Sequence, residues 1–188
     1  MTEDQANALE PMMIANLARA IDFVKFGEAK NAALLTFASA WLLASANVAV
    51  GEAGVATEVR LALILGVPFI AVAAFLALIS FLPRTDLNAL RRAPKTNPRR
   101  NYLYFGDLSQ LPADNCHQRF SDRFLSAGEG RLNEAYFDDL GCQIIVNSKV
   151  AAQKFLLFTW GVRSLILGLG VYAVAAVILV MSRWLTGH

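Results

Sequence analysis

Apolar positions along this chain are gathered into three long blocks, and the stretches between the blocks are polar. The blocks run over residues 32–50, 61–82 and 164–182, and none of them contains a charged side chain. At about 1.5 Å of rise per residue, each block is long enough to cross a hydrocarbon layer of roughly 30 Å. A helix is the only conformation that satisfies the backbone of such a block by itself in lipid. We therefore predict an all-α membrane protein with three transmembrane helices and a small cytoplasmic helical domain between the second and third spans.

This pattern predicts four segments along the chain. Residues 1–31 form a cytoplasmic amphipathic N-terminal helix, and residues 32–82 form a transmembrane hairpin. Residues 83–163 comprise a basic linker and a cytoplasmic sensor domain, followed at 164–188 by the third transmembrane helix and a C-terminal tail. The alternative, three buried helices of a soluble protein, is disfavoured because the blocks are long and uncharged.

Basic residues mark the cytoplasmic side. The loop 51–60 holds one basic residue, Arg60. Six basic residues lie close behind the second block: Arg84, Arg91, Arg92, Lys95, Arg99 and Arg100. The positive-inside rule places that basic stretch in the cytoplasm and the short loop outside. The N-terminus, with Lys25 and Lys30 before the first block, then lies inside, and the C-terminus lies outside.

The polar segments carry helical patterns of their own. A helix is predicted over residues 11–31, with Pro11 at its first position, because an apolar stripe recurs there at spacings of three and four. A short helix after Pro112 is expected to carry Phe120 and Phe124 and to stop near Gly128. The next helix is expected to begin near Arg131, and the pattern allows it to continue into the third span without a break.

Small residues recur at four-residue spacing within the blocks: Ala40 with Ala44, Ala62 with Gly66, Ala73 with Ala77, and Ser164 with Gly168. Such spacing allows the backbones of neighbouring helices to approach closely in a bundle or between protomers. It is also common by chance in alanine-rich spans.

One polar stripe is out of place on the helix before the third span. This stripe adjoins an apolar face, and three of its four residues are polar: it consists of Gln143, Asn147, Val150 and Lys154. Buried hydrogen-bonding groups normally have partners, so this stripe suggests that something occupies them. A structural role for each is the alternative: a solvated lysine, or carboxamides that bridge helices.

The remaining chemistry is sparse. The net charge of +2 suggests no nucleic-acid partner, and catalytic and nucleotide-fold signatures such as HExxH or a Walker loop are missing. Asp138 and Asp139 are adjacent and point about 100° apart on a helix, so they make a poor metal pair. We expect no enzyme, no metal site and no cofactor. A steady transport pathway has little support, since the spans hold few polar groups.

Three places along the chain together resemble the Pycsar transmembrane effectors, bacterial anti-phage proteins activated by cyclic pyrimidine mononucleotides. The first is Glu28-Ala29-Lys30 before the first block, and the second is the aromatic run 101–107 (NYLYFGD). The third is the run 143–154 (QIIVNSKVAAQK), which approaches the last block. The family pattern has aspartate where Glu28 stands, and some relatives have four spans where three are predicted here.

The resemblance implies a membrane effector of abortive infection. Its cytoplasmic region would bind cyclic CMP or cyclic UMP, its spans would then disrupt the bacterial inner membrane, and a pyrimidine cyclase would supply the nucleotide. A homo-oligomer is expected. The alternative function is a membrane anchor or assembly partner for another protein, with no ligand.

A cyclic nucleotide needs a cationic partner for its phosphate, carboxamides for its base edge and an aromatic wall for stacking. Lys154 or Arg100, Gln143 with Asn147, and Tyr102 or Tyr104 are the candidate ligand-binding residues. Taken alone, each has a structural alternative; Tyr102, for example, is equally suited to anchoring at the membrane interface.

Overall fold

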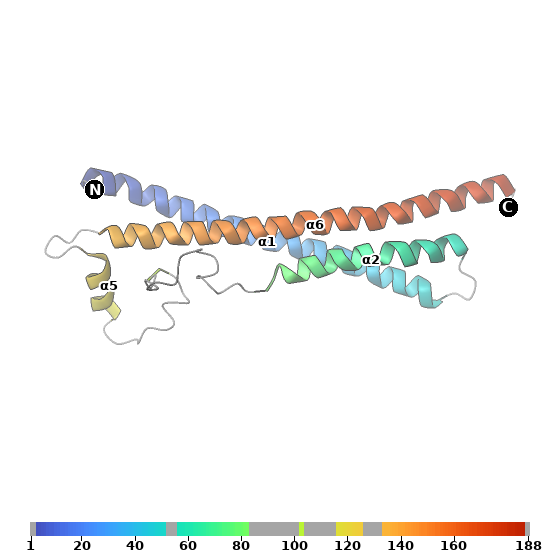
Figure 1. Cartoon of the computed structure of the whole chain (residues 1–188), viewed down its shortest axis with the longest axis horizontal. Helices are drawn as coiled ribbons and strands as arrows, with labels where there is room; N and C mark the ends of the chain where they lie inside the picture. Colours follow the sequence, from blue (N-terminus) through green and yellow to red (C-terminus); the bar gives the residue numbers. More distant parts are fainter. Residues whose placement is uncertain (1–2, 52–55, 83–101, 104–115, 126–132, 187–188) are drawn as a thin grey trace, which may run out of the picture. The chain divides into compact units, whose positions relative to one another are not determined.

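The fold was analysed in a computed structural model, which describes residues 3–51, 56–82, 102–103, 116–125 and 133–186. The elements in these ranges are helices: α1 (Glu3–Gly51), α2 (Thr57–Ile79), α5 (Cys116–Phe124) and α6 (Glu134–Thr186) (Figure 1). The predicted all-α class is therefore confirmed. The basic linker, with Arg100 and Tyr104, lies outside the described residues.

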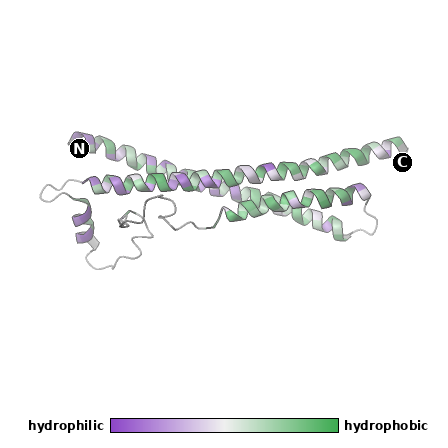
Figure 2. Cartoon of the chain, viewed as in Figure 1, coloured by the Kyte–Doolittle hydropathy of each residue, from purple (hydrophilic) through white to green (hydrophobic). Residues whose placement is uncertain are grey.

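Among the described residues, three helices are long and apolar enough to cross a membrane. The candidate spans lie within Asp4–Val50, Thr57–Ile79 and Glu134–Leu185, which confirms the three spans predicted from the sequence. Figure 2 shows α2 coloured as hydrophobic over most of its length, whereas α5 is mainly hydrophilic. The short helix predicted with Phe120 and Phe124 is α5, and the helix predicted from near Arg131 is α6, which continues without a break through the third span.

Pro11 does not begin a helix, contrary to the sequence prediction. It lies inside α1, which already begins at Glu3. A proline in a helix removes the hydrogen bond to the carbonyl four residues earlier. That carbonyl belongs to Asn7, which is exposed, so water can satisfy it. Residues 3–10 are mostly good helix formers, and the helix therefore extends past the proline.

The described chain divides into two compact units. Unit 1 comprises residues 1–25 and 83–152, and unit 2 comprises residues 26–82 and 153–188. Helices α1 and α6 each contribute to both units, whereas α5 belongs to unit 1 and α2 to unit 2.

Unit 2 is a bundle of three helices with a narrow apolar core. Its buried residues come from all three helices: Leu34, Ala38, Ile70, Ala73, Ala77 and Leu165. Small residues form the contacts, because a Cβ added at Gly168 would lie 2.7 Å from Ile70 and 3.0 Å from the carbonyl of Gly66. A Cβ added at Gly161 would meet Leu34 at 2.6 Å. The backbones of these helices therefore approach one another closely, as small residues at the contacts allow.

The predicted small-residue pairs have different outcomes. Ala62 with Gly66 and Ala73 with Ala77 are buried at the helix contacts. The hydroxyl of Ser164 donates to the carbonyl of Phe69 at 2.8 Å, which joins α6 to α2. Ala40 and Ala44 are exposed instead, so this pair takes no part in the packing of unit 2.

Candidate functional site

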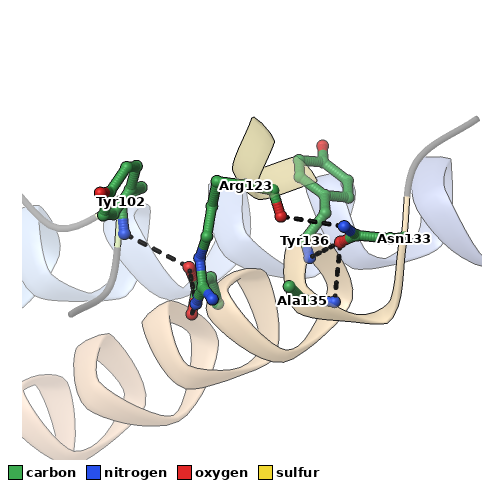
Figure 3. Close-up of polar contacts among 6 residues, drawn as sticks. Tyr102, Arg123, Asn133, Ala135 and Tyr136 are labelled. Carbon is green, nitrogen blue, oxygen red and sulfur yellow. Dashed lines mark hydrogen bonds and ion pairs between the residues drawn. The ribbon is translucent and has the colours of Figure 1, made fainter. Parts of the chain in front are cut away.

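The carboxylate of Asp139 is the polar centre of unit 1. It lies on α6 and is only 2% exposed. One terminal nitrogen of Arg123, on α5, donates to both of its oxygens at 3.1 and 3.0 Å. The backbone N–H of Tyr102 donates to the same carboxylate at 3.3 Å (Figure 3). Asp139 thus joins α5, α6 and the segment that carries Tyr102.

Aromatic rings pack around this ion pair. The ring of Tyr102 lies 5.8 Å from Phe120 and 6.2 Å from Phe124, centroid to centroid. Phe124 is also 5.6 Å from Tyr136, and all three contacts are edge-to-face, an arrangement that aromatic quadrupoles favour. The guanidinium of Arg123 lies 5.7 Å from the centre of the Tyr102 ring. Tyr102 is therefore held from two sides, by its backbone and by its ring.

Asn133 connects α5 to the start of α6. Its side-chain oxygen accepts from the backbone N–H groups of Ala135 and Tyr136, at 3.0 and 3.3 Å. This is the geometry of a helix N-cap. Its side-chain nitrogen donates to the carbonyl of Arg123 at 2.9 Å (Figure 3), so one residue both starts α6 and fixes the end of α5.

The first part of α1 packs on the same stretch of α6. The hydroxyl of Tyr136 donates to Glu10 at 3.2 Å, and burial, together with the neighbouring carboxylate of Glu10, raises the pKa of Tyr136. A Cβ added at Gly141 would lie 3.5 Å from Met13. Met13 lies in the N-terminal part of α1, so this contact also joins α1 to α6.

Gln143 carries the most unusual polar group of unit 1. It follows Asp139 by one helical turn, so both side chains lie on the same face of α6. Gln143 is 7% exposed, and its Nε2 is buried with no hydrogen-bond partner among the described residues. Asn147, one turn further on, uses its side-chain nitrogen to donate to the carbonyl of Gln143 at 2.8 Å. A buried unpaired donor is costly unless another group meets it.

Lys154 lies in unit 2, where its ammonium has two partners. It is 3.1 Å from a carboxylate oxygen of Glu28 on α1 and donates to the carbonyl of Ser80 at 2.8 Å. Ser80 is the C-cap of α2, where unpaired carbonyls attract cations. Lys154 itself is 9% exposed. Its charge thus ties α1 and the end of α2 to α6.

Asn31 completes this arrangement from α1. It is fully buried, and its side-chain nitrogen donates to the carbonyls of Gly27 at 2.8 Å and Lys154 at 3.1 Å. A Cβ added at Gly27 would lie 3.0 Å from that of Lys154, so glycine permits the close approach of α1 and α6. We call Glu28, Asn31, Ser80 and Lys154 the polar clasp. The side-chain oxygens of Asn31 and Ser80 are buried without a partner among the described residues.

The predicted ligand-binding residues are thus distributed over both units. Tyr102, Gln143 and Asn147 lie in unit 1 and Lys154 in unit 2, while Tyr104 and Arg100 fall outside the described residues. Sequence reasoning missed Arg123 and Asn31, and it considered Asp139 only as a metal ligand. In the described part of the chain no cluster of His, Cys, Asp and Glu is suited to a metal ion.

Comparisons with known proteins cover nearly the whole chain. Residues 12–182 match the sequence profile described as PycTM, the Pycsar effector protein domain. The chain is also 31% identical over 172 residues to the Pycsar effector protein RsPycTM of a Rhizobium species, which covers 92% of this chain and 96% of that protein. No solved structure matches the chain.

Proposed function

Because this chain belongs to the PycTM family of Pycsar effector proteins, we propose that unit 1 binds a cyclic pyrimidine mononucleotide and that unit 2 then disrupts the inner membrane. The chain is a transmembrane effector of anti-phage defence. The nucleotide, its site and the damage to the membrane are the proposal. The family consists of membrane effectors rather than known enzymes, and we assign the chain no catalytic step.

The observation that carries the proposal is the side-chain nitrogen of Gln143, which is buried beside the Asp139 centre and has no partner among the described residues. A carboxamide offers one acceptor and two donors. Cytosine and uracil both present a carbonyl at position 2, which Gln143 Nε2 is suited to meet. The side-chain oxygen of Asn147 provides an acceptor one turn away. Both bases fit this chemistry, so the proposal covers cyclic CMP and cyclic UMP.

Tyr102 is the proposed stacking residue for the base, and Tyr104, two residues further along the chain, is the alternative. The contact between its backbone and Asp139 holds it close to the α6 face that carries Gln143. Arg123 has a positioning role, because its charge is engaged by the buried Asp139. Removing Arg123 would take away one contact of the Tyr102 ring and leave the buried carboxylate of Asp139 without this cation.

The phosphate requires a cation. Arg100 is the proposed candidate for a site within unit 1, and Lys154, which belongs to unit 2, is the candidate if the phosphate binds there instead. A phosphate that takes the ammonium of Lys154 has to replace Glu28, which is half exposed. Part of the binding energy would then open the polar clasp, whose residues come from all three helices of unit 2. This exchange would act directly on the helices of unit 2, since a ligand shifts a conformation by its differential affinity for the two states.

Orientation and assembly complete the proposal. Residues 1–31 and 83–163 face the cytoplasm, where a pyrimidine cyclase supplies the nucleotide, and the protein acts as a homo-oligomer in the lipid bilayer. The basic stretch behind the second span supports this orientation.

The test is a ligand-dependent melting experiment on the detergent-solubilised full chain. Cyclic CMP or cyclic UMP should raise the melting temperature by mass action, whereas cyclic AMP should not. The same nucleotide should release a dye from vesicles that contain the protein. A protein that ignores both pyrimidine nucleotides in both assays is a membrane anchor or assembly partner, which is the alternative function.

A further inference from the structure

The contacts of unit 2 fix the height of each residue along the bundle. In this unit, helices α1 and α6 run parallel, and each residue of α1 lies beside the residue 127 positions later in α6. Three contacts share this offset: Gly27 with Lys154, Leu34 with Gly161, and the hydroxyl of Ser45 with that of Tyr172. Lys30 is therefore level with residue 157. At the other end, Glu58 on α2 lines a groove with Val174, Ala175 and Ile178. The levels of Lys30 and Glu58 are thus about 30 Å apart, the thickness of a hydrocarbon layer.

Arg163 lies between these two levels. It is six residues past the level of Lys30, which places its Cα about 9 Å further along the helix. It is exposed and belongs to an exposed stripe of α6 that also carries Leu156, Trp160 and Leu167. The described parts of 31–57 and 61–82 on the other two helices carry no charge. The sequence pattern placed Arg163 just before the third span.

The side chain of Arg163 bends back along α6. Its guanidinium carbon lies 5.1 Å from the centre of the Trp160 ring, in the direction of the helix N-terminus that long helical side chains prefer. The charge therefore points toward the Lys30 end of the layer. Arginine near a membrane boundary reaches for the interface in this way, and tryptophan favours the same depth.

A second copy of the chain offers Arg163 no carboxylate. Among the described residues, acidic side chains of unit 2 lie at or beyond the two charged levels: Glu28 at one end and Glu58 at the other. A copy in the same or the opposite orientation would bring none of them to the depth of Arg163. The phosphates of the lipid leaflet on the Lys30 side are the nearest anions, and guanidinium binds phosphate well.

We propose that Arg163 and Trp160 form a lipid-binding site on the exposed face of α6, which takes the phosphate of a phospholipid and draws it into the apolar layer. The headgroup is pulled inward together with its water, so the bilayer is thinned along α6. The site acts on lipid whether or not a nucleotide is bound. It goes beyond the proposed function and does not depend on it.

The experiment measures how close lipid headgroups come to Trp160. In the full chain, Trp41→Phe and Trp184→Phe leave Trp160 as the fluorophore, and phenylalanine retains the ring that Trp41 packs on Tyr172. The protein is reconstituted in phosphatidylcholine vesicles that carry a nitroxide either on the headgroup or deep on the acyl chain. The headgroup label should quench Trp160 strongly. Arg163→Leu should lose most of this quenching and gain quenching by the acyl label, whereas Arg163→Lys should retain it.

Arg183→Leu is the matched control, because it removes an exposed arginine from the far end of the same helix and should change neither signal. Equal headgroup quenching in Arg163→Leu and its parent would overturn the proposal. So would a parent that neither label quenches, because a second copy would then cover the site. Inorganic phosphate in the buffer should leave headgroup quenching intact, and displacement by it would overturn the assignment to lipid.

Discussion

The ammonium of Lys154 lies 3.1 Å from the carboxylate of Glu28, and this ion pair joins two of the three sequence motifs on which the family resemblance rests. One motif precedes the first span and the other approaches the last. Asn31 adds a second bridge between the same helices through the carbonyl of Lys154. The clasp therefore sits where α1 and α6 enter unit 2, and its residues are the first to examine by substitution.

Lys154→Met is expected to lower the stability of the protein without ligand by about 1–3 kcal/mol, because the variant loses a buried charge-assisted hydrogen bond to Ser80. If Lys154 binds the phosphate, nucleotide affinity should also fall by roughly ten- to a hundredfold. Melting curves without ligand and binding isotherms measure the two effects. If the variant is less stable without ligand but binds the nucleotide with unchanged affinity, Lys154 is not part of the ligand site and acts only in the polar clasp.

Glu28→Gln is the companion variant. It keeps the charge of Lys154 and removes its competing carboxylate, so a nucleotide phosphate should bind more tightly than in the parent. Half of the Glu28 side chain is exposed, and water screens the pair, so the loss of stability should be smaller than for Lys154→Met. Weaker binding in Glu28→Gln would contradict the exchange of Glu28 for phosphate.

Gln143→Leu should separate binding from stability. The unpaired Nε2 of Gln143 contributes no hydrogen bond among the described residues, so an apolar side chain of similar size should leave the ligand-free melting temperature unchanged or raise it. Nucleotide affinity should fall about tenfold, equivalent to about 1.4 kcal/mol. Calorimetric titration of Gln143→Leu against the parent measures this. Unchanged affinity would place the base elsewhere.

Arg123→Met should be among the most destabilising changes in unit 1. It leaves the buried carboxylate of Asp139 without its cation, and breaking a buried ion pair in this way costs about 3–5 kcal/mol. Asp139→Asn should cost less, since Arg123 is partly exposed. The double variant should be more stable than the sum of the single losses predicts, which thermal melts of all four proteins can establish. Additive losses would mean that the pair is not coupled.

The orientation of the chain is open to a direct test. Reporter fusions at Gly54 and Gly128 should signal from outside and from the cytoplasm, respectively, because six basic residues follow the second span closely and one lies in the loop before it. An external signal from the Gly128 fusion would reverse the proposed orientation and place the nucleotide site outside the cell.

The sequence pattern left the continuation of α6 into the third span open, but the three spans were predictable because hydrophobic length and helical period are local properties of the sequence. The same holds for α5 with Phe120 and Phe124. The clasp was not predictable, since Glu28, Ser80 and Lys154 lie far apart in the sequence and only packing brings them together. Pro11 failed as a start signal because flanking helix formers and a hydrated carbonyl offset one missing hydrogen bond. Arg163 shows a further limit: the depth of a residue depends on the register between helices, which no single block reveals.

The uninterrupted backbone of α6 has a mechanical consequence. Its 53 residues form a rod of about 80 Å, held along its length by hydrogen bonds from each turn to the next. No hinge loop along this rod can absorb torsion. Within unit 2, a twist of α6 at Lys154 would therefore be carried as torque along the span, and it would change the azimuth of Arg163 and of the apolar side chains around it.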